Sequence, residues 1–81
     1  MKHIIFKQKY DTLLIKTLGI SQNQIKSEVH FINDLGIDSL DLIELTMIIE
    51  KEFKILIPDT EAEQLNTIGE VEDYIKNKLN W

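Results

Sequence analysis

One serine stands where a fixed hydroxyl could take part in chemistry. Ser39 follows Asp38 at the start of a stretch with helical periodicity, so its hydroxyl is expected to be exposed and held in a fixed direction. A serine hydrolase would place its nucleophile in a Gly-x-Ser-x-Gly turn, but Ile37 and Asp41 occupy the two glycine positions here. The sequence therefore argues against a hydrolase and leaves Ser39 as an exposed serine at the beginning of a helix.

The chain offers no second group that would complete a catalytic or metal site. It contains no cysteine, which excludes disulfides, thiolate metal sites and a cysteine nucleophile. Its two histidines, His3 and His30, are expected to be surface residues rather than general bases. The acids between positions 34 and 41 do not form a calcium loop, because Gly36 would stand at the third ligand position. We therefore expect no catalytic residue and no metal site, in a protein that is not itself an enzyme.

The first helix is predicted from an apolar face that ends at Gly19, a residue suited to cap a helix C-terminus. The residues of this face are Phe6, Tyr10, Leu13, Leu14 and Leu18. Residues 19–38 show no long period, and so long a loop is unusual in a small domain unless it packs onto the core. The apolar residues expected to pack there are Ile20, Ile25, Val29, Phe31 and Ile32.

Three more helices are predicted after this loop. Asp38 is a good N-cap for a second helix that runs to about Phe53. Thr60, with a glutamate three residues later, resembles a capping box that opens a short third helix ending near Leu65. Thr67 begins a second such box, which opens the last helix. The buried face of that helix is predicted to be Val71, Tyr74, Ile75 and Leu79.

The predicted fold is all-α, a small four-helix bundle of three longer helices and one short helix, with a long loop between the first and second helices. The length suits one domain over residues 1–81. The run Ile55-Leu56-Ile57 favours a β-strand but has no partner run. The apolar run at residues 4–6 is too short for a signal peptide or a membrane span. A cytoplasmic protein is therefore expected, with a mature form trimmed from an organelle precursor as the alternative. We also expect a monomer.

Charge is distributed very unevenly along the chain. The net charge of −5 combines +4 over residues 1–27, −11 over residues 28–75 and +2 over residues 76–81. An acidic middle argues against nucleic acid as a partner, because phosphate backbones attract clustered lysines and arginines. It favours basic protein surfaces, which such a charge would attract over a distance.

The second helix is predicted to have two apolar faces. One holds Leu45 and Ile49, whereas Leu40, Ile43 and Met47 form a stripe nearly opposite. Either the third helix or the long loop covers this stripe, or the stripe is a docking surface with an acidic rim. We favour docking. The acids expected to take part are Asp38, Asp41, Glu44, Glu50 and Glu52.

The segment from Phe31 to Asp41 resembles the signature of acyl carrier proteins, in which Asp-Ser-Leu begins the second helix after an Asp-Leu-Gly loop. The resemblance covers essentially the whole chain, from about Phe6 to Leu79. Asp-Ser-Leu alone is a weak signal, but it is strong at this spacing. The other matching stretches are Leu18-Gly19-Ile20, Glu44-Leu45, Glu50, Glu52-Phe53, Ile57-Pro58-Asp59, Glu61-Ala62-Glu63 and Tyr74-Ile75.

The resemblance implies that Ser39, flanked by Asp38 and Leu40, carries a 4′-phosphopantetheine arm. A separate phosphopantetheinyl transferase would add the arm from coenzyme A, and its terminal thiol would hold acyl groups as thioesters. The resemblance also implies a cleft between the second and third helices that shelters the acyl chain. The candidate lining residues, which could equally be plain core, are Phe31, Ile49, Ile57, Ala62 and Leu65.

The acidic character favours fatty-acid or related acyl-chain biosynthesis, with partner enzymes that present basic docking patches. A specialised carrier of aminoacyl, peptidyl or polyketide intermediates stays open as an alternative. So does an unmodified interaction module of the same fold, although the intact Ser39 counts against it. Two positions depart from the family pattern: Lys51 stands where acids are common, and Ile48 stands where a small residue is usual.

Overall fold

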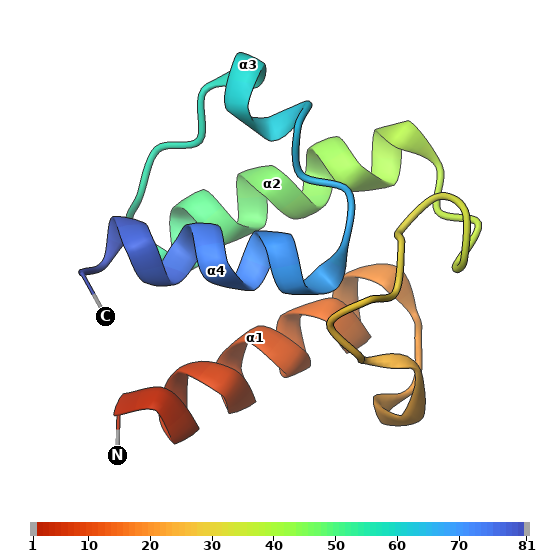
Figure 1. The fold of residues 1–81 in the computed structure, drawn as a ribbon, viewed down its shortest axis with the longest axis horizontal. Helices are drawn as coiled ribbons and strands as arrows, with labels where there is room; N and C mark the ends of the chain where they lie inside the picture. The colour runs from red at the N-terminus through yellow and green to blue at the C-terminus, as the bar shows by residue number, and fades with distance from the viewer. Residues whose placement is uncertain (1, 81) are drawn as a thin grey trace.

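The computed structural model describes residues 2–80 and confirms the all-α prediction. Figure 1 shows three longer helices packed around a common centre, with the short helix at one edge. No β-strand occurs in the described range, where a single isolated bridge pairs His30 with Thr67. The elements are α1 (Lys2–Leu18), the 3₁₀ turn η1 (Gln22–Gln24), α2 (Ser39–Phe53), α3 (Asp59–Ala62) and α4 (Ile68–Lys78).

The boundaries of the longer helices follow from local capping. Gly19 has φ +69°, and its N–H donates to the carbonyl of Ile15, which ends α1. The Thr67 hydroxyl accepts from the N–H of Glu70, and the Glu70 carboxylate accepts from the N–H of Thr67, so the predicted capping box of α4 is confirmed. Each bond involves residues close in sequence, which is why these boundaries are readable from the sequence.

The core lies where α1, α2 and α4 meet. Tyr10 of α1 is fully buried, and its hydroxyl donates to the carbonyl of Ile68 at 2.8 Å, which joins α1 to the start of α4. The ring of Phe6 packs against that of Phe53, which ends α2, with centroids 5.3 Å apart. The remaining buried apolar residues are Leu14, Ile20, Phe31, Leu45, Ile49, Ile57, Ile68, Val71 and Ile75.

The long loop between α1 and α2 packs onto this core, with one exception to the prediction. Ile20 and Phe31 are buried, but Ile32 is 47% exposed, so its predicted place in the core is wrong. The reason lies in the turn that starts there: the carbonyl of Ile32 accepts from the N–H of Gly36, and the neighbouring Phe31 side chain takes the interior position. In such a turn, adjacent side chains point in different directions.

The third helix is also shorter than predicted. It is a single turn over Asp59–Ala62, and its N-cap is Pro58, which has no side-chain cap hydrogen bond. The Thr60 capping box is therefore wrong. The carbonyl of Pro58 accepts from the N–H groups of Glu61 and Ala62, both at 2.9 Å, so the backbone begins the turn before Thr60 is reached. Proline suits this position because its φ is already helical.

The arrangement places the start of α2 at one edge of the molecule. In Figure 1, α1 begins and α4 ends at the opposite edge, near the marks for the two chain ends. Within residues 2–80, no helix has both the length and the apolar character needed to cross a membrane.

Candidate functional site

Ser39 is the first residue of α2, and its side chain is exposed. Asp38 caps the helix as predicted: its Oδ1 accepts from the N–H of Leu40 at 3.2 Å and lies 3.4 Å from the Ser39 Oγ. The Ser39 hydroxyl thus lies beside the N–H groups of the first turn, where the helix dipole favours an anion. The position is open to a reagent from solution and fixed relative to α2.

The loop that precedes Ser39 is stabilised by hydrogen bonds between its own side chains and backbone. The Asp34 carboxylate accepts from the N–H of His30 at 2.7 Å, and Nδ1 of His30 accepts from the N–H groups of Ile32 and Asn33. Gly36 closes the turn with φ +66°, a conformation that other residues rarely adopt. The role of His30 and Asp34 was not predicted from the sequence, because it depends on the folded path of the loop.

The second apolar face of α2 is not covered by the rest of the chain. Leu40, Ile43 and Met47 are 70%, 57% and 62% exposed, so neither α3 nor the long loop covers them. We call these three residues the apolar stripe. Asp41 and Glu44 are exposed beside it. An apolar patch with charged neighbours has the composition of an interaction surface.

Two of the predicted rim acids are engaged elsewhere. The Glu50 carboxylate accepts from the N–H of Ile57 at 2.9 Å, so this side chain supports the chain before α3 instead of standing free on the rim. Glu52 is turned toward α1: its carbonyl accepts from the Lys9 ammonium at 3.0 Å, and its carboxylate lies 4.0 Å from the same group. The exposed acidic rim beside the stripe is therefore shorter than the helix pattern predicted.

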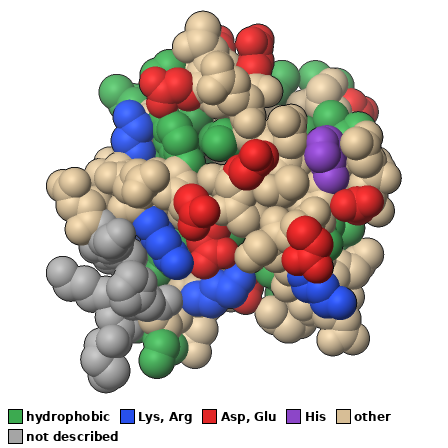
Figure 2. Space-filling view, in the orientation of Figure 1, with side chains coloured by type: hydrophobic (Ala, Val, Ile, Leu, Met, Phe, Trp, Pro, Cys, Tyr) green, Lys and Arg blue, Asp and Glu red, His purple; other side chains and the backbone are tan. Residues whose placement is uncertain are grey.

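Acidic side chains also extend beyond α2. Figure 2 shows acidic side chains from the top to the lower middle of one face, with lysines beside several of them in the lower half of the view. The excess of acids agrees with the net charge of −5. Among the described residues, no group of three or more His, Cys, Asp or Glu side chains is placed to hold a metal ion.

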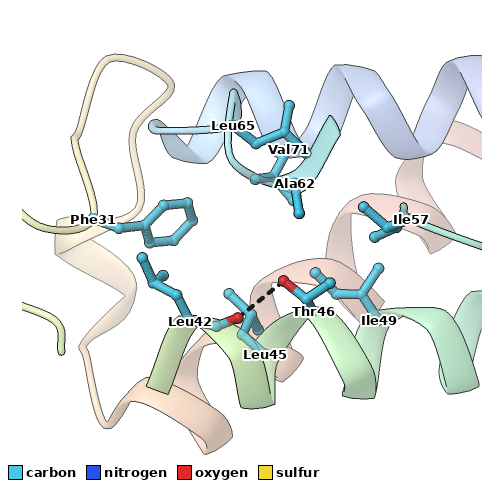
Figure 3. A pocket seen from close by; sticks show the side chains of 9 residues that line it. All are labelled: Phe31, Leu42, Leu45, Thr46, Ile49, Ile57, Ala62, Leu65 and Val71. Atoms are coloured by element: carbon cyan, nitrogen blue, oxygen red, sulfur yellow. Dashed lines mark hydrogen bonds between the residues drawn. The ribbon is translucent and has the colours of Figure 1, made fainter. Parts of the chain in front are cut away.

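A small apolar cavity of about 50 Å³ lies between α2 and α3. Figure 3 shows side chains from α2, from the chain around α3, from the loop and from α4 pointing into it. The Thr46 hydroxyl donates to the carbonyl of Leu42 at 2.9 Å, so this polar group is satisfied within α2. All five predicted cleft residues line the cavity, together with Leu42, Leu45, Thr46 and Val71, which were not predicted; the five are Phe31, Ile49, Ile57, Ala62 and Leu65.

One hydrogen bond joins α3 to α4 beside this cavity. The Tyr74 hydroxyl of α4 donates to the Glu61 carboxylate of α3. Burial and, to a smaller extent, the hydrogen bond to Glu61 together raise the pKa of Tyr74 to about 12. From the sequence, Tyr74 was predicted only to lie on the buried face of the last helix, because nothing in the sequence pairs it with Glu61.

A comparison with known families agrees with this geometry. Residues 11–75 match a family model described as a phosphopantetheine attachment site. The chain therefore belongs to the phosphopantetheine attachment site family, whose members carry 4′-phosphopantetheine covalently on a serine. The residues present fit that group, because the chain has an exposed serine hydroxyl at a helix start with anion-favouring N–H groups beside it.

Proposed function

We propose that this protein is an acyl carrier protein of fatty-acid or related acyl-chain biosynthesis, and that its arm is attached to Ser39. The observation that carries the proposal is the position of the apolar cavity relative to this serine. Leu42, one turn after Ser39 on the same helix, lines the cavity. A flexible arm on Ser39 would therefore have an apolar shelter within reach, which suits an alkyl chain better than a polar aminoacyl group.

The surroundings of the three serines favour Ser39 over the others. Ser21 caps the turn η1, and its Oγ lies 3.4 Å from the side-chain oxygen of Gln24. Ser27 lies against the start of α4, where its carbonyl accepts from the N–H of Gly69 and a Cβ on that glycine would come within 2.9 Å of the Ser27 Cβ. Ser39 combines exposure with the first turn of a long helix.

The chain's own residues would bind and position the cargo without reacting with it. Asp38 holds the first turn of α2, so the attachment oxygen keeps one direction relative to the apolar stripe and the cavity. When attached, the arm supplies a thiol that forms a thioester, whose carbonyl carbon stays electrophilic. The cavity would shield an alkyl chain from water, and partner enzymes would supply the catalytic groups.

The apolar stripe and its acids would dock those partners in the cytoplasm. Asp41 and Glu44 would attract a phosphopantetheinyl transferase and acyl-chain enzymes that present basic patches, while Leu40, Ile43 and Met47 would fill the contact. The shortened rim places the charge at the Ser39 end of α2, close to where any enzyme must reach the arm.

The proposal is tested with a phosphopantetheinyl transferase and coenzyme A. Intact mass spectrometry should show one added arm on the wild-type protein, and peptide mapping should place it on Ser39. Ser39→Ala should stay folded and remain unmodified, whereas the matched variant Ser27→Ala should be modified as the wild type is. Modification of Ser39→Ala, or none of the wild type with several transferases, would contradict the assignment.

A further inference from the structure

The wall of the cavity formed by α3 is the least anchored part of the core. α3 is a single turn without a side-chain cap. The two residues that this wall contributes to the cavity are only half-buried: Ala62, which ends α3, and Leu65, three residues after it. The bond from Ile57 to the Glu50 carboxylate fixes the chain where it enters this segment. The bond from Tyr74 to Glu61 fixes the turn itself. Few other polar contacts hold the wall in place.

The cavity is too small to hold cargo with the wall in this position. An enclosed apolar cavity of about 150 Å³ is known to take up one benzene molecule. The cavity here, at about 50 Å³, is a third of that size. An alkyl chain of more than a few carbons therefore requires the wall to move away from α2. The opposite wall cannot yield easily, because Leu45 and Ile49 of α2 are buried in the main core.

The Tyr74–Glu61 hydrogen bond joins α3, which must move when the cavity widens, to α4, which is held in the core. Tyr74 belongs to α4, whose neighbouring residues Val71 and Ile75 are buried. Glu61 is adjacent to Ala62, which lines the cavity (Figure 3). A displacement of α3 that widens the cavity therefore separates the hydroxyl from the carboxylate. The cost of opening includes the loss of this bond.

We propose that the Tyr74–Glu61 hydrogen bond is a latch that sets how readily the α3 wall opens, and thereby the length of acyl chain that the cavity accepts. This inference rests on the proposed function, since it concerns the cargo of the same site. The latch favours the closed state when the arm is empty or carries a short group. A longer chain buries more apolar surface on entry, so it overcomes the latch where a short chain does not.

The test compares thioester protection in variants that carry acyl chains of different lengths. Wild type and Tyr74→Phe are loaded with acetyl, hexanoyl, decanoyl or tetradecanoyl groups, and cleavage by hydroxylamine is followed by mass spectrometry. Tyr74→Phe should lower the cleavage rate of hexanoyl and decanoyl thioesters by about threefold to tenfold, the range expected for one partly exposed hydrogen bond. The acetyl thioester should react equally in both proteins.

Controls separate the latch from a general effect on stability. Tyr10→Phe makes the same chemical change at the bond to Ile68, away from the cavity, and should leave every protection ratio unchanged. Glu61→Gln keeps an acceptor and should resemble wild type, whereas Glu61→Ala should act like Tyr74→Phe. The double variant Tyr74→Phe with Glu61→Ala should show no larger effect than either single variant. If circular dichroism shows that Tyr74→Phe does not fold, Glu61→Ala takes its place as the variant that removes the hydrogen bond.

The two proposals fail in different ways. Equal protection of each acyl group in wild type, Tyr74→Phe and Glu61→Ala would overturn the latch while leaving the carrier function intact. If long and short acyl groups on the wild type were cleaved at the same rate, the cavity would not shelter cargo, and both the shelter and the latch would be overturned. An arm that could not be attached at all would overturn the proposed function first.

Discussion

The two sides of α2 are built differently. On the side facing α1 and α4, buried aromatic rings are combined with polar contacts: the Lys9 ammonium lies 5.1 Å from the Phe53 ring centroid and donates to the carbonyl of Glu52 at 3.0 Å. On the side facing α3, a cavity remains and a single helical turn closes it. The difference indicates that the side facing α1 and α4 fixes the orientation of α2, whereas α3 on the other side can move away from α2.

The side of α2 that faces α1 and α4 is further stabilised by ion pairs, one of which joins α1 to α4. Glu72 of α4 pairs with Lys7 at 3.6 Å and with Lys76 at 3.3 Å, and the Asp11 carboxylate also accepts from the Gln22 side chain at 3.0 Å. These contacts link α1, η1 and α4 into one unit. Nothing comparable joins α3 to its neighbours within residues 2–80, apart from the bonds made by Glu50 and Tyr74.

The largest expected effect on the free energy of unfolding comes from replacing one leucine by alanine on each of the two sides of α2. Leu14→Ala removes a fully buried leucine of α1 and should cost about 2–5 kcal/mol in the free energy of unfolding. Leu65→Ala removes a half-buried leucine beside the cavity and should cost clearly less, because fewer contacts are lost. Urea denaturation measures both values. Equal losses would show that the two sides are equally well packed.

A smaller effect is expected from filling the cavity. Ala62→Val adds two methyl groups to the α3 wall and should raise the free energy of unfolding of the unloaded protein by up to about 1 kcal/mol. It should also reduce the rise in melting temperature caused by a decanoyl cargo. Thr60→Val places the same residue on the exposed face of the same turn and serves as the control. If both variants behaved alike, the space beside Ala62 would have no part in cargo binding.

Alkaline pH should weaken the α3 side through Tyr74. Its pKa is raised from 10.0 to about 12 in the folded protein, first by burial and then by Glu61. A raised pKa means that the contribution to stability is complete below pH 10 and is lost as the pH rises toward about 12. Tyr74→Phe removes this contribution. The difference in melting temperature between the two proteins should therefore shrink between pH 10 and 12; a constant difference would contradict the prediction.

The smallest effect on stability is expected from the titration of Glu70 at the start of α4. Hydrogen bonds from the backbone N–H groups of Asn66 and Thr67 lower the pKa of the Glu70 carboxyl below 4.5. A lowered pKa gives stability that is present above pH 4.5 and lost as the pH falls through the folded-state value. Glu70→Gln keeps an oxygen acceptor but does not titrate. Melting curves should show the wild type losing its advantage over this variant on acidification, and an unchanged gap would argue against the capping box.

Features that depend on neighbouring residues could be predicted from the sequence, whereas those that depend on the folded path could not. The caps at Gly19, Asp38 and Thr67 involve partners within four residues, and all three were predicted. The start of α3 was not, because the backbone already turns at Pro58. The N–H of Glu63, which a capping box at Thr60 would need, donates to the carbonyl of Asp59 instead. Ile32 was misplaced since apolarity alone does not say which of two adjacent side chains faces the core.

In the candidate site too, contacts between segments far apart in the sequence could not be predicted. The five cleft residues came from a family resemblance, and all of them line one cavity. The engagement of Glu50 with Ile57 could not be foreseen, because a helix pattern places a side chain on a face but does not reveal a backbone N–H that approaches from another segment. The contact between Tyr74 and Glu61 joins two helices whose relative position only the fold defines.

The positions of the start of α1 and the end of α4 have a practical consequence. Because α1 begins and α4 ends at the edge of the molecule opposite the start of α2 (Figure 1), a support or fusion partner joined near either end lies away from Ser39. The molecule can thus be tethered near the start of α1 or the end of α4 without covering the exposed hydroxyl of Ser39. An immobilised layer of this protein would present Ser39 outward, whichever end was attached.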